Sequence, residues 1–148
     1  MDREKRRALH VWIALNRAMH TFDKPLREQV EAHDLTMKSF AVLEVLLHKG
    51  PLPIGEIGER VLLTSGSMTY VIDQLEERGL LVRCPCEHDR RVQIVALTEA
   101  GTALINTVFP DHAERLNTLM HDLSLEDRET LFQLLRQLQA SAETAVDS

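Results

Sequence analysis

Small hydroxyl, amide and phenol side chains gather on one side of a predicted helix that runs from about residue 65 to residue 78. Such groups can form hydrogen bonds with phosphates and with the edges of bases. The other side of the helix carries apolar residues at a spacing of three and four, which is typical of a helix packed on a core: Met68, Val71, Ile72 and Leu75. Together with the residue expected to cap the helix, the polar set is Thr64, Ser65, Ser67, Thr69, Tyr70 and Gln74.

A hairpin with an arginine tip is predicted directly after this helix. Strands are expected over residues 80–83 and 92–97. The loop between them holds Arg90 and Arg91, whose planar cations suit a DNA backbone or a narrow, strongly negative minor groove. A short helix over 54–61 comes first, so the order of elements is that of a winged helix-turn-helix. Taken separately, the polar helix face and the arginine loop would each be ordinary solvated surface.

Two segments are more distinctive when they are taken together. One is Asp89-Arg90-Arg91 followed by Leu97-Thr98-Glu99-Ala100-Gly101, and the other is the helical segment 67–80. They resemble the wing signature, D-x-R…L-T-x-x-G, and the recognition helix of the multiple-antibiotic-resistance regulator (MarR) family of winged-helix repressors. The resemblance implies a sequence-specific transcriptional regulator that binds double-stranded DNA. It also implies that Arg91 enters the minor groove while Asp89 pairs with it and holds its guanidinium in place.

Long amphipathic helices are predicted at both ends of the chain. The first spans about residues 2–32 and contains Pro25, which is expected to kink or split it. Two further helices are expected to begin at caps, Thr98 and Ser124, with a bend at Pro110 in the former. Their apolar seams are longer than one small lobe can cover, which favours an intertwined homodimer over packing on the chain's own core. The seam residues are Leu9, Trp12, Leu15, Met19, Phe22, Leu26 and Val30 in the first helix and Leu131, Leu134, Leu135 and Leu138 in the last.

The expected fold is therefore mainly α with a small β-wing, in a single domain of 148 residues. About residues 36–100 are expected to form the winged helix-turn-helix lobe that binds DNA. About residues 1–35 and 101–148 are expected to supply N- and C-terminal dimerisation helices. A two-fold dimer suits a pseudo-palindromic operator whose half-sites lie about one helical turn apart.

Composition and charge narrow the classes of function. The net charge is −6, and residues 111–148 hold eight acidic and three basic residues, which leaves a charge of −1 on residues 1–110. The lobe is not strongly basic, so few phosphate contacts per protomer are expected. The sequence has no run of 18 apolar residues and no secretory signal, which predicts a cytoplasmic protein with no membrane span.

The two cysteines of the chain both lie in the segment Cys84-Pro85-Cys86-Glu87-His88. Residues two apart on a strand share a face, so both thiols and the imidazole could point together, which suggests metal binding or thiol sensing. Three ligands within five residues are a poor set for tetrahedral zinc, and a disulfide across one residue would be strained. Ordinary wing residues are therefore favoured, no cofactor or metal is assigned, and a redox sensor at Cys84 and Cys86 stays an alternative.

The family resemblance also implies an inducer. In the family, small aromatic or phenolic anions bind where the dimerisation helices meet the winged-helix lobe and release the repressor from DNA. Apolar and polar side chains that could line such a crevice here are Trp12, Asn16, His20, Phe40 and His112. Ordinary packing in the core or in the dimer seam is the alternative for each of them.

Two other classes of function compete with DNA binding as interpretations of the sequence. An enzyme is not expected, because the sequence has no phosphate-cradling glycine loop, no H-E-x-x-H and no G-x-S-x-G motif. A winged-helix module that binds other proteins is the more serious alternative, because the chain is acidic. Salt separates the two, since DNA affinity should fall steeply with ionic strength and a mainly apolar protein interface should not.

Overall fold

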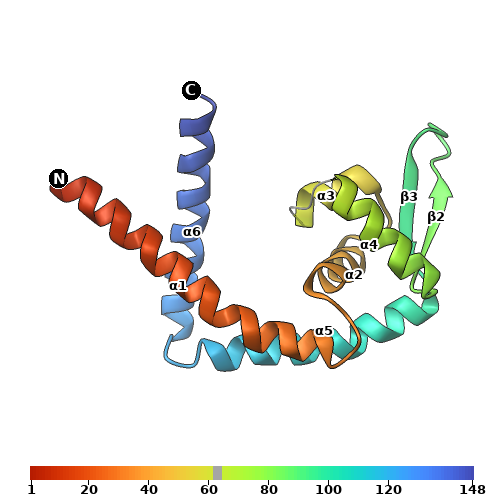
Figure 1. Ribbon diagram of the computed structural model, residues 1–148, viewed down its shortest axis with the longest axis horizontal. Helices are drawn as coiled ribbons and strands as arrows, with labels where there is room; N and C mark the ends of the chain where they lie inside the picture. Colours follow the sequence, from red (N-terminus) through yellow and green to blue (C-terminus); the bar gives the residue numbers. More distant parts are fainter. Residues whose placement is uncertain (62–64) are drawn as a thin grey trace. The chain divides into compact units, whose positions relative to one another are not determined.

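The computed structural model describes residues 1–61 and 65–148 (Figure 1), and Thr64 lies outside these ranges. The chain is mainly helical with a small three-stranded wing, as the sequence predicted. In chain order the elements are α1 (Arg3–Glu31), α2 (Met37–Lys49), β1 (Leu52–Pro53), α3 (Ile54–Val61), α4 (Ser65–Glu77), β2 (Leu81–Pro85), β3 (Gln93–Leu97), α5 (Glu99–Leu119) and α6 (Leu125–Val146).

The three strands form one antiparallel sheet in the order β1-β3-β2. Val95 of β3 is fully buried and pairs with Leu52 on one side and Arg83 on the other, so this face of the sheet covers the core. Strand β2 extends to Pro85, two residues further than predicted. Proline lacks a backbone N–H, and it is tolerated here because β2 is an edge strand.

The helix ends follow the expected capping chemistry. The hydroxyl of Thr36 accepts a hydrogen bond from the backbone N–H of Ser39 at 3.1 Å, and Ser124 caps α6 in the same way. Helix α4 is followed by Gly79, which has a φ of 75° in the left-handed region that favours glycine. The predicted split of the first helix at Pro25 is not observed, because α1 continues through it from Arg3 to Glu31.

The chain divides into two compact units, Met1–Arg115 and Leu116–Ser148. The first contains the hydrophobic core, to which α1, α2, α3, α4, the wing strands and α5 all contribute. The second contains the end of α5 and all of α6. Within it the guanidinium of Arg128 donates hydrogen bonds to the side chain of Asn117 at 2.7 Å and to the backbone carbonyl of Met120 at 2.8 Å, which fixes the turn between the two helices.

Both terminal helices expose apolar side chains within the single chain. Trp12 of α1 is 63% exposed and Leu134 of α6 is 56% exposed, and α6 has no buried residue. Other large apolar side chains on these two helices are also exposed: Leu9, Met19, Leu131, Leu135 and Leu138. Among the helices that the structure describes, none is both long and apolar enough to cross a membrane.

Candidate nucleic-acid interface

Helix α4 has the two faces that the sequence predicted. Met68, Ile72 and Leu75 are almost fully buried in the core, which anchors the helix. On the opposite side Tyr70 is 66% exposed, and Thr69 and Gln74 are exposed as well. Ser67 is half-buried, and Ser65 is the first residue of the helix. The helix therefore presents a row of hydrogen-bonding side chains on a rigid, well-packed base.

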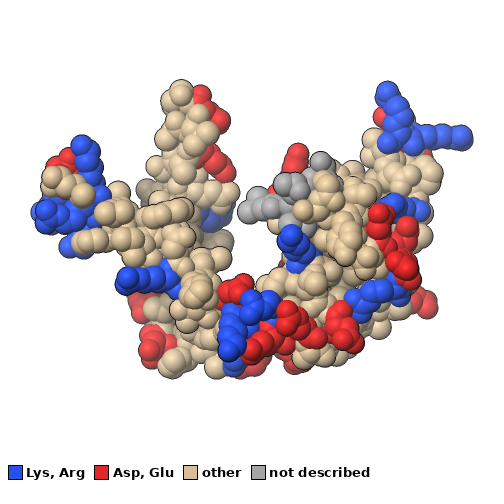
Figure 2. All heavy atoms as spheres, in the orientation of Figure 1, with Lys and Arg blue, Asp and Glu red and all other residues tan. Residues whose placement is uncertain are grey.

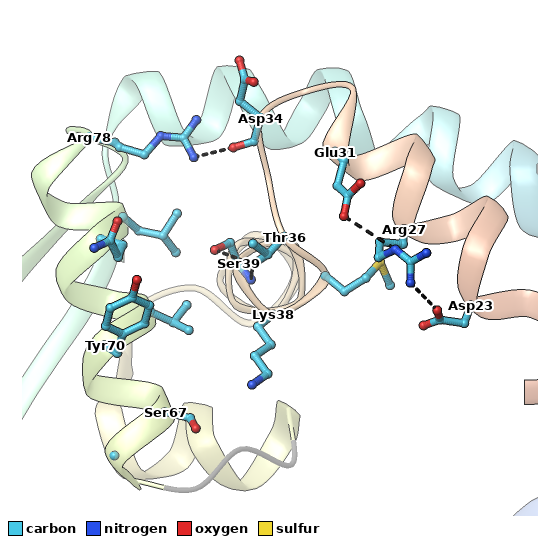
Figure 3. Close-up of a pocket in the computed structure, with 15 residues that line it drawn as sticks. Asp23, Arg27, Glu31, Asp34, Thr36, Lys38, Ser39, Ser67, Tyr70 and Arg78 are labelled. Atoms are coloured by element: carbon cyan, nitrogen blue, oxygen red, sulfur yellow. Dashed lines mark hydrogen bonds and ion pairs between the residues drawn. The ribbon is translucent and has the colours of Figure 1, made fainter. Parts of the chain in front are cut away.

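An open groove of about 860 Å³ runs along this polar face (Figure 3). Its first wall is α4, with Ser67, Tyr70 and Gln74. The facing wall is formed by the C-terminal part of α1, the loop after it and the first turn of α2. The groove therefore offers open space beside the exposed face of α4.

The charges around this groove differ in how far they are neutralised. Arg27 is paired with Asp23 at 2.7 Å and with Glu31 at 3.6 Å on α1. Arg78 donates a hydrogen bond to the backbone carbonyl of Asp34 at 2.7 Å. The side chain of Lys38 extends from the first turn of α2 into the groove, and it makes no ion pair within the described residues (Figure 3). Lys38 is therefore a cation available to an anionic ligand beside α4.

The wing tip holds its second arginine in a defined position. The carboxylate of Asp89 accepts hydrogen bonds from the Nε atom of Arg91 at 3.1 Å, from Nη2 at 3.2 Å and from the backbone N–H at 3.0 Å. The side-chain hydrogen bond, followed by the backbone one, lowers the pKa of Asp89 below its ordinary value. The Arg91 side chain is still 90% exposed, and Arg90 beside it is exposed too. Figure 2 shows basic side chains, in blue, projecting from the end of the β2–β3 hairpin.

Comparison with known proteins agrees with this geometry. The sequence pattern of the MarR family matches residues 35–92, which include α2, α3, α4 and most of the wing. The HTH-type transcriptional regulator MhqR of Bacillus subtilis is 39% identical over 136 residues, which cover 92% of this chain and 94% of MhqR. This chain belongs to the MarR family. It is therefore a DNA-binding transcriptional regulator and not an enzyme.

Two solved structures of DNA-binding proteins share the fold over nearly the whole chain. A cysteine-to-serine variant of MarR from E. coli, complexed with operator DNA, has a TM-score of 0.80 at 22% identity, covering 89% of this chain and 95% of the other. Bordetella bronchiseptica BpsR, whose DNA binding is regulated by 6-hydroxynicotinic acid, has a TM-score of 0.79 at 25% identity, covering 88% and 98%. The terminal helices, which the family pattern does not cover, are thus part of the shared fold.

The L-T-x-x-G part of the MarR-type wing signature has a structural explanation in this chain. The hydroxyl of Thr98 donates to the carbonyl of Gly79 at 2.6 Å and accepts from the N–H of Gly101 at 3.0 Å. A side chain on Gly101 would overlap the backbone carbonyl of Leu80. These two residues therefore dock the start of α5 against the segment between α4 and β2. The motif positions the interface but does not itself supply a side chain for DNA.

The predicted inducer residues are divided between two places in this MarR-family chain. The rings of Phe40 and His112 are in contact, with centroids 4.4 Å apart, where α2 meets α5. Burial lowers the pKa of His112, with a partial opposing effect from Glu44. Trp12, Asn16 and His20 lie in the exposed N-terminal part of α1, where the side-chain amide of Asn16 donates to the backbone carbonyl of Trp12 at 2.8 Å.

Sequence reasoning missed Lys38 as a candidate contact. The signal was present, because Lys38 follows the Thr36 cap by two residues and so belongs to the first turn of α2. A position in the first turn could not, however, be placed beside α4 without the tertiary structure. Gln29 was missed as well, and its buried Oε1 atom has no hydrogen-bond partner within the described residues.

Proposed function

We propose that this protein is a homodimeric repressor that binds a pseudo-palindromic operator, and that a small aromatic anion releases it. The observation that carries the proposal is the exposed polar face of α4, on the same compact unit as an arginine-tipped wing. This face borders a groove that contains Lys38, which makes no ion pair with any residue the structure describes. In this arrangement α4 enters the major groove, and the wing reaches the adjacent minor groove or backbone.

The proposed contacts to base edges come from α4. Gln74 can pair with adenine, and the phenol of Tyr70 and the hydroxyls of Ser67 and Thr69 can bind base edges or phosphates. The start of α4, at Ser65, is suited to a phosphate, whereas Thr64, the predicted cap, lies outside the described residues. At the wing, Arg91 enters the minor groove with Asp89 orienting its guanidinium, and Arg90 contacts the backbone.

Lys38 is the additional phosphate contact that we propose from the groove. A lysine ammonium acts on phosphate as a point charge, so this contact adds affinity without base specificity. We expect Lys38→Ala to weaken binding to every DNA sequence and to reduce the slope of log affinity against log salt by about 1. Lys49→Ala is the matched control, because Lys49 lies at the other end of α2 and outside the groove. If Lys38→Ala and Lys49→Ala changed DNA affinity and its salt dependence equally, Lys38 would not be a phosphate contact.

The exposed seams of α1 and α6 support the homodimer. Large apolar side chains left open on two long helices need a partner surface, and a second copy of the chain supplies the same seams by symmetry. Sedimentation at micromolar concentration should give twice the 16.9 kDa mass of the chain. Leu135→Asp should dissociate or unfold the protein because it would bury an unpaired charge, whereas Gln133→Asp, on the opposite side of α6, should not. A monomeric wild type would refute the dimer.

The operator itself can be found by selecting bound duplexes from random DNA. We expect a two-fold symmetric motif with half-sites about one helical turn apart, and affinity that falls steeply with ionic strength. A winged-helix module for other proteins would select no motif. Failure to enrich any sequence at low salt would therefore count against the proposed function.

The proposed inducer site includes the contacting pair of Phe40 and His112. The buried Nδ1 atom of His112 has no hydrogen-bond partner in the part of the chain that the structure describes, which leaves a polar group that a ligand could satisfy. The exposed part of α1, with Trp12, Asn16 and His20, would be covered in the dimer, so a crevice that contains all five residues is expected only there. The regulation of BpsR by 6-hydroxynicotinic acid supports an aromatic anion as the class of ligand.

Release from DNA requires that the ligand bind the DNA-incompetent state more tightly than the competent one. We expect a coupling of about 1–3 kcal/mol between ligand and DNA. A thermal-shift screen of phenolic and aromatic carboxylic acids should find ligands that also release labelled operator. His112→Phe should keep the ring contact with Phe40 and lose the response to the ligand. A ligand that releases the variant equally well would place the site elsewhere.

A further inference from the structure

Both thiols of the chain lie on the outer face of the wing. In the sheet register Arg83 pairs with the buried Val95, and Arg83 reaches Asp73 of α4, so this side of β2 faces the core. Because successive side chains of a strand alternate, Cys84 points to the opposite, outer face, and Cys84 is exposed. It pairs with Ile94 there.

The extended backbone continues beyond the end of β2 to the second cysteine. The N–H of Cys86 donates to the carbonyl of Val92 at 2.8 Å, which is the next step of the same antiparallel register. Cys86 is therefore on the outer face with Cys84, and it is half-buried. Neither thiol makes a hydrogen bond within the described residues. By the register, Cys84 and Cys86 thus share this outer face of the hairpin with the apolar residues Val82, Val92, Ile94 and Ala96.

The spacing of the two residues decides what the pair can do. The backbone of a strand rises about 3.3–3.4 Å per residue, so the Cα atoms of residues two apart are about 6.6–6.8 Å apart. Their Cβ atoms point to the same face and have a similar separation. A disulfide needs Cβ atoms about 3.5–4.5 Å apart, so the strand would have to break its pairing to form one. In a linear S–metal–S unit, two metal–thiolate bonds of about 2.3 Å place the sulfur atoms about 4.6 Å apart. Starting from the strand spacing, each sulfur atom needs to move only about 1 Å toward the other to reach this separation. The geometry suits an ion held between the sulfurs and disfavours a direct S–S bond.

We propose that Cys84 and Cys86 bind one soft monovalent metal ion, Cu(I), in linear coordination between two thiolates. Thiolates select soft ions, and a site with only two protein ligands favours an ion that is stable in linear, two-coordinate geometry over ions that need four ligands. The described residues include no cluster of three or more histidine, cysteine or acidic side chains that could complete a tetrahedral site. On binding, each S–H bond breaks, two protons pass to the solvent and two S–Cu bonds form. The ion enters as Cu(I), so no electron is transferred.

Loading the site should also affect the wing's contact with DNA, a consequence that rests on the proposed function. Two thiolates and one monovalent cation carry a net charge of −1, a few residues from Arg90 and Arg91. This charge repels phosphates near the wing tip, within the range over which charges act at low salt. We expect the loaded protein to bind operator DNA roughly twofold to fivefold more weakly at low salt, with the difference shrinking as salt is added.

The binding site is tested by anaerobic titration of the full chain, without DNA, using Cu(I) and the redox-inert Ag(I) against a competing chelator. We expect one ion per chain. Cys84→Ser and Cys86→Ser should each weaken binding about a hundredfold or more, because the second thiolate binds intramolecularly. X-ray absorption should show two sulfur ligands and no nitrogen ligand, and the control His88→Ala should bind like wild type. Unchanged affinity in either cysteine variant, two ions per chain, or a loss in His88→Ala would overturn the linear dithiolate site.

The consequence for DNA is tested separately on the selected operator. Wild-type protein loaded with Ag(I) should bind it more weakly than unloaded protein, and the double variant Cys84→Ser/Cys86→Ser should not respond to Ag(I). If the ion binds but DNA affinity does not change, the regulatory consequence is overturned while the metal site stands. If no operator can be selected at all, the proposed function fails, and the metal titration is still decisive for the site.

Discussion

The guanidinium of Arg83 on β2 donates a hydrogen bond to the carboxylate of Asp73 on α4. The Arg83 side chain is only 24% exposed, and its Nε atom is buried without a partner within the described residues. Helix α4 carries the polar face, and β2 leads to the arginine tip of the wing. This ion pair therefore joins the two halves of the DNA-binding surface and is placed to hold the wing at a set position against α4.

Breaking this pair should reduce stability and loosen the wing. Asp73→Asn should lower the free energy of unfolding by about 1 kcal/mol, since Asp73 is half-exposed and its attraction to Arg83 is partly screened. Urea unfolding of Asp73→Asn, Arg83→Gln and the double variant should give a coupling energy of about 0.5–1 kcal/mol. Glu56→Gln, which breaks the surface pair with Arg60 on α3, is the control and should cost less. Additive effects of the two single changes would contradict a direct interaction.

Gly101→Ala should destabilise the protein severely. The new methyl group would overlap the backbone carbonyl of Leu80, which cannot move without shifting β2 and the start of α5. We expect a loss of about 3 kcal/mol or more, in the range seen for overpacking and backbone displacement. Gly55→Ala in α3 is the matched control, because its methyl group meets no atom within 4 Å, and it should be neutral or slightly stabilising. Thermal unfolding of both variants tests this, and similar melting temperatures would be inconsistent with the close approach.

The wing carboxylate should act through Arg91 and not only through its charge. Arg91→Ala should weaken DNA binding by about 1–3 kcal/mol with a flatter salt dependence. Removing a negative charge near DNA should by itself increase affinity, as expected for Glu87→Ala. Asp89→Ala removes the same charge but frees the Arg91 guanidinium, so it should gain less affinity than Glu87→Ala or lose affinity. Fluorescence anisotropy at several salt concentrations measures all three, and equal gains from Asp89→Ala and Glu87→Ala would show that Asp89 has no orienting role.

The stability of the protein should decrease as the pH falls below about 6.5, the ordinary pKa of histidine. Burial lowers the pKa of His112 in the folded chain, so the unfolded chain binds more protons in the range between the lowered and the ordinary pKa. The lost stability should level off once the pH is below the folded pKa. His112→Phe should remove this part of the pH dependence, and His121→Ala, on an exposed histidine, should leave it in place. A pH profile unchanged in His112→Phe would assign the effect to other groups.

Much of the fold follows from local patterns in the sequence. The apolar spacing of Met68, Val71, Ile72 and Leu75 was sufficient to orient α4, because a helix with one apolar stripe can bury only that stripe. Capping residues such as Thr98 and Ser124 located helix starts, because their hydroxyls satisfy N–H groups within the same turn. The wing motif from Asp89 to Gly101 identified the family. In each case the physical cause acts between residues close in sequence.

The tertiary structure decided the relationships between segments distant in sequence. Arg83 and Asp73 were both visible as charged residues, but their pairing depends on how the hairpin folds back on α4. Lys38 became a candidate DNA contact only when the packing of α2 placed it in the groove beside α4. The common face of Cys84 and Cys86 required the register of β2 against β3 to continue past Pro85. Periodicity specifies which side of an element is buried, but which element covers it is a property of the whole packed core.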